Sequence, residues 1–448
     1  MPELSGFPYF EVEFRKDGTI FDQNQVQQVT EGVRSRGISD LFVISHGWNN
    51  DRSEARDLYA RFFSQVRSAL NAGTIPGASG RTYGVVGVFW PSKKFAESEL
   101  IPGGGAASIG GGIGEAAIIA RLEDLKGVFD APGADDHLEE AKALVPRLED
   151  SPAARDKFVD LIRKLFPESD ETEEKIPPKF FEEQGRNIIE DLGTPLAVEM
   201  AAHAGGGSGA AAMGEGMPGA GTFEGAAGLG DVFNKIRTGV QNILNFTTYY
   251  QMKERAGTVG RNGVNRMLRA LRAAHPGLKL HLIGHSFGGR LVTAAADGPG
   301  NEPPVKIDSM MLLQAAFSHN GFSGNYDGHG AAGFFRTVVA GGKVAGPILI
   351  SHSSFDKAVG IAYPLAGRIV RDAAAALGDA NDKFGGMGRN GAQKTAEAIF
   401  GDLLPVAGTY TFQPGRIYNL KAENYIKDHS DICKREVAHA LLCAVGGT

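Results

Sequence analysis

A serine set between two glycines is the residue of this chain best suited to nucleophilic chemistry. The motif consists of Gly284, His285, Ser286, Phe287 and Gly288. It fits the pattern Gly-x-Ser-x-Gly, in which a serine occupies a sharp turn from a strand to a helix. The apolar run 278–285 predicts that strand, and LVTAAA after the motif predicts the helix. We therefore expect Ser286 to be a nucleophile, with its small neighbours and His285 supporting the turn.

Glycine is abundant enough to provide an alternative interpretation of this motif. The chain has 62 glycines among 448 residues, about twice the usual share. A glycine-rich turn without catalytic meaning is therefore the alternative. The strand before the motif and the helix after it favour the nucleophile.

A serine hydroxyl needs a base to take its proton, and the base needs a third group that holds its tautomer. His429 follows a predicted strand at 415–422, and Asp356 follows one at 346–352. The carboxyl ends of parallel strands meet at one edge of a sheet, so we expect His429 to be the base and Asp356 the acid that orients it. For Asp356 the alternative is a helix N-cap.

Five other residues have suitable side chains but less suitable positions: His319, His352, His439, Asp428 and Asp431. His319 follows an earlier strand, and His352 precedes the proposed acid. His439 lies in the predicted C-terminal helix and is expected to pack in the core. The two aspartates are too close to His429 in sequence to orient its ring from a separate strand, so we expect them to cap the last helix.

Acyl transfer also needs hydrogen-bond donors at the oxygen that becomes negative in the transition state. The backbone N–H of Phe287, directly after the nucleophile, is one expected donor. The predicted strand 41–46 leads into a second donor, the N–H of Trp48, because Gly47 allows a tight turn and His46 precedes it. An ordinary β-turn at Gly47 is the alternative.

Short apolar runs alternate with helical patterns over most of the chain. Strands are predicted at 10–14, 41–46, 84–90, 278–285, 307–317, 346–352 and 415–422. These runs are continuously apolar, which is typical of strands buried on both faces of a parallel sheet. A helix is predicted at 257–275, where Val264, Leu268 and Leu271 share a face beside Met267. The expected fold class is α/β, a mostly parallel sheet flanked by helices.

An acidic helical segment interrupts this pattern. Residues 121–192 carry 20 Asp and Glu against 11 Lys and Arg, and they show helical spacing of apolar residues. The Gly/Ala-rich stretches 101–120 and 203–230 bracket the segment, and we expect both to be flexible. The predicted organisation is a core of residues 1–91 and 240–448 with an inserted cap at 92–239. A solvated helical surface is favoured for the acidic segment over an acidic binding surface.

Composition excludes several other functions. The two cysteines, Cys433 and Cys443, form neither a disulfide framework nor a zinc motif, and we expect both to be buried on a C-terminal helix. The formal net charge of −6, without a basic run, argues against nucleic-acid binding.

No secretory signal is visible at the N-terminus, so a cytoplasmic location is expected. The stretch 100–120 contains seven glycines and makes a poor membrane span. Nothing in the composition indicates the oligomeric state.

The motifs together resemble the α/β-hydrolase superfamily, and more narrowly bacterial lipases and esterases. The resemblance rests on His46-Gly47-Trp48 after one strand, GHSFGG at 284–289 after another, and Asp356 and His429 in that order. It covers residues 38–91 and 240–445. It implies Ser286 as nucleophile, His429 as base, Asp356 as orienting acid and the Trp48 and Phe287 N–H groups as oxyanion donors. It implies no metal and no organic cofactor, and it places 92–239 where such enzymes often have a cap or lid.

The expected function is a serine hydrolase that cleaves a carboxylic ester, or a related acyl bond, through an acyl-serine intermediate. The expected substrate is a small or lipid-like acyl compound. A serine peptidase or an acyltransferase with the same triad is the first alternative, because the triad does not distinguish water from an amine or alcohol acceptor. A non-catalytic interaction protein on a hydrolase scaffold is the second.

Overall fold

The computed structural model of the chain describes residues 2–92, 114–166, 176–194, 229–300, 302–356, 358–359 and 385–448. These residues form a nine-stranded sheet of order β1-β2-β4-β3-β5-β6-β7-β9-β8. Its strands are β1 (Glu3–Leu4), β2 (Phe7–Glu13), β3 (Asp40–Ser45), β4 (Tyr83–Phe89), β5 (Lys279–His285), β6 (Ser309–Leu313), β7 (Ile348–His352), β8 (Ala398–Asp402) and β9 (Ile417–Lys421). Only β1 pairs antiparallel, with β2, and every other pair is parallel. The predicted class, a mostly parallel sheet flanked by helices, is confirmed.

The central strands are apolar on both faces because helices cover both faces. In β3, Leu41 and Val43 belong to one apolar cluster, whereas Phe42 and Ile44 belong to the cluster on the opposite face. All six residues of this strand are buried. Alternate side chains of a strand point to opposite faces, so a strand between two helical layers needs a continuous apolar run.

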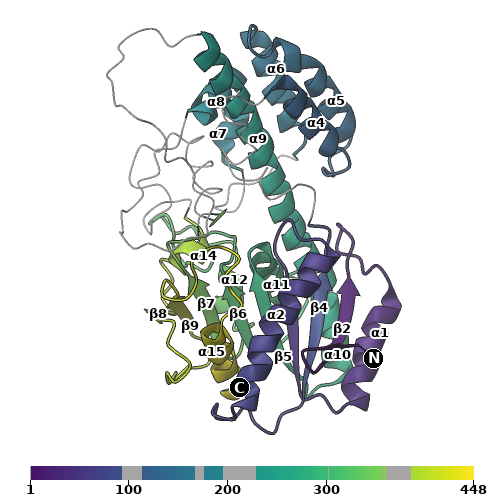
Figure 1. Ribbon diagram of the computed structural model, residues 1–448, viewed down its shortest axis with the longest axis vertical. Helices are drawn as coiled ribbons and strands as arrows, with labels where there is room; N and C mark the ends of the chain where they lie inside the picture. Colours follow the sequence, from purple (N-terminus) through teal and green to yellow (C-terminus); the bar gives the residue numbers. More distant parts are fainter. Residues whose placement is uncertain are drawn as a thin grey trace.

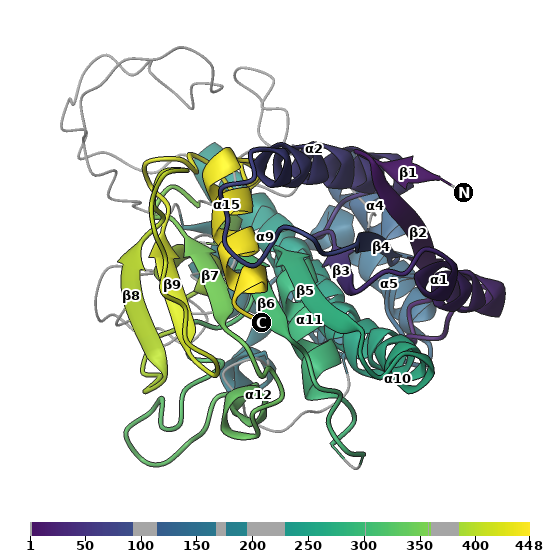
Figure 2. The ribbon, with the colours of Figure 1, turned by 90° about the horizontal axis from the view of Figure 1, so that it is seen from below.

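The helices form one layer on each face of the sheet (Figure 2). The first cluster contains residues of α1 (Gln23–Ser35), α10 (Asn265–Ala274), α11 (Phe287–Asp297) and α12 (Arg336–Ala340). The second contains residues of α2 (Arg52–Asn71) and α15 (Arg435–Gly446). The short helix α14 (Met387–Asn390) lies beside β7.

A group of helices stands beyond the carboxyl ends of the strands, and one long helix joins it to the sheet (Figure 1). The group contains α4 (Glu115–Asp124), α5 (Ala134–Leu144), α6 (Pro152–Arg163), α7 (Pro178–Glu182) and α8 (Gly185–Gly193). The joining helix is α9 (Leu229–Thr258), which packs against α8 at one end and α11 at the other. At 1.5 Å per residue, a helix of this length spans about 45 Å.

Polar contacts and a shared core attach the helical group to the sheet. On α9, Arg255 donates hydrogen bonds to the carbonyls of Val128 (2.6 Å) and Pro91 (3.1 Å), and Lys16 pairs with Asp130. Buried apolar residues of the group belong to the same cluster as those beneath α11. The boundary expected at residue 240 lies inside α9, so this helix belongs to both parts.

The structure confirms the seven predicted strands in position and corrects several details. The strands β1 and β8 were not predicted. The segment expected to be a strand at 307–317 is shorter, because β6 ends at Leu313. The helix expected at 257–275 contains a π-helical stretch at Val259–Val264. There Gly260 lies so close to the carbonyl of Leu291 on α11 that a side chain would not fit.

Some predictions about the linking segments lie outside the described residues. Residues 101–113 and 203–228 of the glycine-rich stretches are among these, as is most of the apolar stretch 100–120. Residues 115–120 begin α4, so that part is helical. None of the described helices combines the length and the apolar character needed to cross a membrane. Cys433 precedes α15 rather than lying on it, and both cysteines are free and half-buried.

A buried ion pair forms at the start of β3, and its contribution to the free energy of unfolding can be measured. Asp40 accepts hydrogen bonds from Arg81 (2.7 Å), His281 (3.1 Å) and Ser39 (2.6 Å). Burial alone would raise the pKa of Asp40, but the hydrogen bonds from His281, Ser39 and Arg81 outweigh it and lower the pKa to about 2. The ionised carboxylate therefore stabilises the fold.

We expect Asp40→Asn to lower the free energy of unfolding at pH 7 by about 3–5 kcal/mol, because it leaves buried partners without their counter-charge. The folded pKa is depressed, so the stabilisation is fully present above the ordinary pKa of 3.8 and is lost as the pH falls through about 2. Urea unfolding at pH 7 and at steps toward pH 3 should show the difference from wild type shrinking. Asp57→Asn, on the exposed face of α2, should change stability by less than about 0.5 kcal/mol. A constant difference across this pH range would contradict the account.

Candidate active site

Ser286 occupies the sharp turn that the sequence predicts. β5 ends at His285 and α11 begins at Phe287, and Ser286 between them has φ 56° and ψ −125°. A positive φ is unfavourable for a residue with a side chain, so the surroundings must hold this conformation. The Ser286 N–H donates to the carbonyl of Leu313 at the end of β6 (3.0 Å), and the Ser286 carbonyl accepts from Gly289 (2.9 Å) and Ala316 (3.0 Å).

The turn is tight because glycines allow backbones to touch. A Cβ on Gly288 would lie 2.6 Å from the carbonyl oxygen of His46, and one on Gly284 would lie 2.5 Å from the α-carbon of Gly289. Contacts this close leave no room for a side chain at either position. Both glycines of the motif are therefore required by packing, as the sequence predicts.

His429 and Asp356 meet at this edge of the sheet. The Nδ1 atom of His429 lies 3.0 Å and 2.9 Å from the two carboxylate oxygens of Asp356. Because a carboxylate can only accept, Nδ1 carries the proton and Nε2 presents its lone pair. This is the tautomer that a general base for a serine hydroxyl needs.

The Asp356 side chain is fully buried and held from several directions. It also accepts hydrogen bonds from the Val359 N–H (3.0 Å) and from Nε2 of Gln314 (3.2 Å). Burial opposes ionisation, but the attraction of His429 in its protonated form and the hydrogen bonds from His429 and Val359 outweigh it and hold the pKa of Asp356 below its ordinary value. The hydrogen bond from the Val359 N–H is the contact expected if Asp356 were a helix N-cap, the alternative role given above. Asp356 makes this contact and the contact to His429 at the same time.

Gln314 is a residue of this site that the sequence reasoning missed. It follows β6 with a φ of 45°, and its side chain is completely buried. Its Nε2 also donates to the carbonyl of Gly388 (3.0 Å), and its Oε1 accepts from Ser351 (3.0 Å). These bonds fix the amide that faces Asp356. Its one sequence signal was a polar amide inside the apolar run that predicted a strand at 307–317.

His429 packs against the residue that precedes Ser286. The ring of His429 lies 5.0 Å, between centroids, from that of His285, the neighbour of Ser286. No bond joins Ser286 Oγ to His429 in the part of the chain that the structure describes. Catalytic hydrogen bonds are often long in free enzymes and shorten when substrate binds. The arrangement places His429 against the neighbour of Ser286, with the contact between His429 and Asp356 fully formed.

The loop after β3 lies against the serine. A Cβ on Gly47 would lie 2.6 Å from Cβ of Ser286 and 3.1 Å from its Oγ. The Gly47 carbonyl accepts from Nδ1 of His46 (2.9 Å), which fixes the peptide shared with the Trp48 N–H. Among the described residues, neither that N–H nor the Phe287 N–H has an acceptor. Both donors proposed for an oxyanion are therefore available.

His46 is a neutral structural residue of this loop. Its ring stacks on Trp90 with centroids 5.7 Å apart, and its carbonyl accepts from the Trp90 indole N–H (3.1 Å). Burial lowers the pKa of His46 to about 4, although the hydrogen bond to Gly47 works in the opposite direction. A neutral ring that donates from Nδ1 is consistent with its expected supporting role.

Aromatic rings connect both candidate donors to the long helix. Trp48 and Phe287 lie 5.9 Å apart between ring centroids, and Tyr249 of α9 lies 6.2 Å and 5.0 Å from them. Aromatic pairs at these distances contribute about 0.5–1.5 kcal/mol each beyond their burial. The helix that joins the helical group to the sheet therefore also supports this site.

The other candidate residues have different surroundings. His439 is buried and contacts the carbonyl of Gly408 (2.8 Å), as expected for a packed residue. His319 contacts Asn390 (3.1 Å), and the ring of His352 packs on Phe400.

The expectation that Asp428 and Asp431 cap the last helix was wrong. Asp428 accepts from the Ser430 N–H (2.8 Å), and Asp431 accepts from the Lys427 N–H (3.2 Å) and pairs with Lys434. The N-cap position of α15 is Lys434, whose side chain makes no capping bond. The aspartates instead shape the loop that carries His429.

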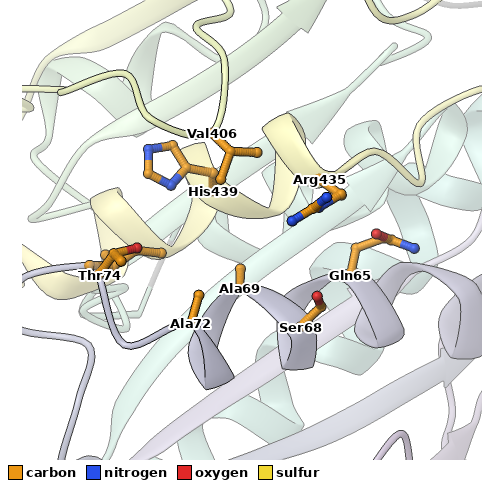
Figure 3. Close-up of a pocket in the computed structure, with 9 residues that line it drawn as sticks. Gln65, Ser68, Ala69, Ala72, Thr74, Val406, Arg435 and His439 are labelled. Atoms are coloured by element: carbon orange, nitrogen blue, oxygen red, sulfur yellow. The ribbon is translucent and has the colours of Figure 1, made fainter.

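The described residues offer no metal-centred alternative to this site. They contain no group of three or more His, Cys, Asp or Glu side chains placed to hold a metal ion. A small cleft between α2 and α15, of about 20 Å³ and lined by residues such as Ser68, Arg435 and His439, includes none of the triad (Figure 3). That volume is about enough for one water molecule.

Comparison with protein-family models, curated proteins and solved structures finds no match to this chain. The roles of these residues therefore rest on their geometry and chemistry.

We expect Gly47→Ala to slow hydrolysis of p-nitrophenyl acetate about 100-fold, because the added methyl group would displace Ser286 or the oxyanion loop. Gly277→Ala is the matched control, since a Cβ there meets nothing within 4 Å. Initial rates and urea midpoints of both variants check the prediction. Full activity in a folded Gly47→Ala protein would show that this loop does not border the reaction.

Proposed function

We propose that this chain is a serine hydrolase of the α/β-hydrolase class that cleaves a carboxylic ester or a related acyl bond. The observation that carries the proposal is the pair formed by His429 and the buried Asp356 beside a serine held at positive φ. Backbone strain of this kind costs about 1–3 kcal/mol and is concentrated at functional sites. The order of the three residues along the chain, after β5, β7 and β9, also fits this class.

The proposed reaction begins with attack of Ser286 Oγ on the substrate carbonyl carbon, while His429 Nε2 takes the hydroxyl proton. The carbonyl electron pair moves to oxygen, and the N–H groups of Trp48 and Phe287 stabilise the resulting oxyanion. Asp356 stabilises the imidazolium through Nδ1. Each oxyanion donor of this type typically contributes about 2.7–4 kcal/mol to transition-state stabilisation.

Collapse of this intermediate breaks the ester bond, and His429 gives its proton to the leaving alcohol. Water then attacks the acyl-serine as His429 takes a proton from it. The second collapse releases the acid and returns the proton to Ser286. Each half-reaction uses the same base and the same two N–H donors, so no further group is required from the protein.

We also propose that the helical group is a cap over the catalytic edge. Its place beyond the carboxyl ends of the strands (Figure 1) supports this role, because active sites of open α/β sheets lie at that edge. A cap that limits substrate size would make kcat/KM fall as the acyl chain of p-nitrophenyl esters lengthens from acetate to palmitate. Equal values along that series would count against a size-limiting cap.

We expect the wild-type protein to hydrolyse p-nitrophenyl acetate with an initial burst of p-nitrophenol, because acylation precedes the slower attack of water. Ser286→Ala should remove both the burst and the steady-state rate. Stopped-flow absorbance gives the measurement, at enzyme concentrations high enough to detect one p-nitrophenol released per active site. Parallel assays with aminoacyl amides and with added alcohol acceptors distinguish a peptidase or an acyltransferase. A folded wild-type protein without activity toward any of these substrates would contradict the proposal.

We expect Asp356→Asn to lower kcat by about 10³- to 10⁴-fold, because an amide can donate to Nδ1 and favour the wrong tautomer of His429. Asp431→Asn is the control, since Asp431 lies two residues from His429 but bonds Lys427 and Lys434 instead. The control should keep kcat within about twofold of wild type. Equal losses in the two variants would argue that Asp356 has no specific role.

A further inference from the structure

His285, the second residue of the serine motif, makes a direct contact with the loop of the proposed base. Its Nε2 atom lies 2.9 Å from the main-chain carbonyl oxygen of His429. A carbonyl can only accept, so Nε2 is the donor and carries the proton. One side chain next to the nucleophile thus holds the backbone of the residue that must take the nucleophile's proton.

The His285 ring uses only one of its two nitrogens. Its Nδ1 is buried and has no hydrogen-bond partner in the described part of the chain. Burial, together with the repulsion that a protonated His429 exerts, lowers the pKa of His285 to about 3, although the hydrogen bond to the His429 carbonyl opposes this. The ring is therefore neutral and adds no repulsion when His429 becomes an imidazolium 5.0 Å away.

The two ends of this contact differ in how firmly they are held. His285 is the last residue of β5, paired in register with Leu313 of β6, and it is 5% exposed. His429 lies in the irregular loop between β9 and α15, among exposed and half-buried residues. A hydrogen bond from the rigid strand to the loop fixes where the loop can place the imidazole. Asp356 fixes the other side of the same ring.

We propose that His285 is a positioning residue, which holds His429 in line with Ser286 by donating from Nε2 to the His429 carbonyl. This inference rests on the proposed hydrolase reaction for its effect on rate. The contact itself can be tested without any activity. Two substitutions of equal length separate the donor from the volume of the side chain. Gln has an N–H donor four bonds from the α-carbon, as His Nε2 is, whereas Met has a methyl group there.

We expect His285→Met to lower kcat for p-nitrophenyl acetate by about 10- to 100-fold with little change in KM, because displacement of a catalytic group by about 1 Å can cost that much. His285→Gln should retain kcat within about threefold of wild type. Hydrogen–deuterium exchange, followed by mass spectrometry, should show faster exchange of amides at 423–432 in the Met variant and nearly wild-type exchange in the Gln variant. Urea midpoints should show that both variants are folded.

Each outcome decides a separate point. Unchanged exchange at 423–432 in the Met variant would show that His285 does not hold the loop of His429, whether or not the wild-type protein is active. Faster exchange with unchanged kcat, in an active protein, would overturn the effect on catalysis. Equal loss of kcat in the Gln and Met variants would show that the ring, rather than its donor, matters. An inactive wild-type protein would contradict the proposed function, and the exchange data would still decide the contact.

Discussion

The positive φ of Ser286 is the constraint on which the rest of the site depends. That backbone conformation is unfavourable for a residue with a side chain. It persists because hydrogen bonds and close packing hold the turn. Leu313 at the end of β6 accepts the serine N–H, and the glycines of the motif let the turn approach the loop after β3. Packing of β5, β6 and α11 therefore supplies the energy that keeps the serine in this strained conformation. The same close approach places Gly47 against the serine, so the strain and the candidate oxyanion loop are parts of one arrangement.

Parallel strands explain how distant parts of the chain meet here. β3, β5, β7 and β9 end at one edge of the sheet, and they lead into Gly47, Ser286, Asp356 and His429 in turn. Three further side chains donate hydrogen bonds to these residues. His46 bonds the Gly47 carbonyl, His285 the His429 carbonyl and Gln314 the Asp356 carboxylate. The first two are neutral because burial depresses the pKa of each. The pair of His429 and Asp356 thus has neutral hydrogen-bonding partners in His285 and Gln314, and α9 adds Tyr249 against both candidate oxyanion residues.

Much of this arrangement could be predicted from local patterns. The central strands are recognisable because burial on both faces requires continuous apolar runs, and Ser286 is recognisable because the turn requires Gly284 and Gly288. The edge strand β8 escaped because its residues are mostly exposed and show no such run. Gln314 was not predicted because its role depends on a hydrogen bond to Asp356, which lies 42 residues away in sequence. No local pattern encodes such a contact. The continuity of α9 across residue 240 and the loop-shaping bonds of Asp428 likewise depend on tertiary packing. Chain order could place Asp356 and His429 at one edge, but only the fold shows the two bonds between them.

The most direct test of a nucleophilic Ser286 is to find where a covalent probe attaches. Treating the folded protein with a fluorophosphonate, followed by intact mass and peptide mapping, follows displacement of fluoride by the serine oxygen. The account predicts one adduct per chain, on the peptide that contains Ser286, and none in Ser286→Ala or in protein unfolded in urea. A folded wild-type protein that remains unmodified, or that carries the adduct on another residue, would contradict it.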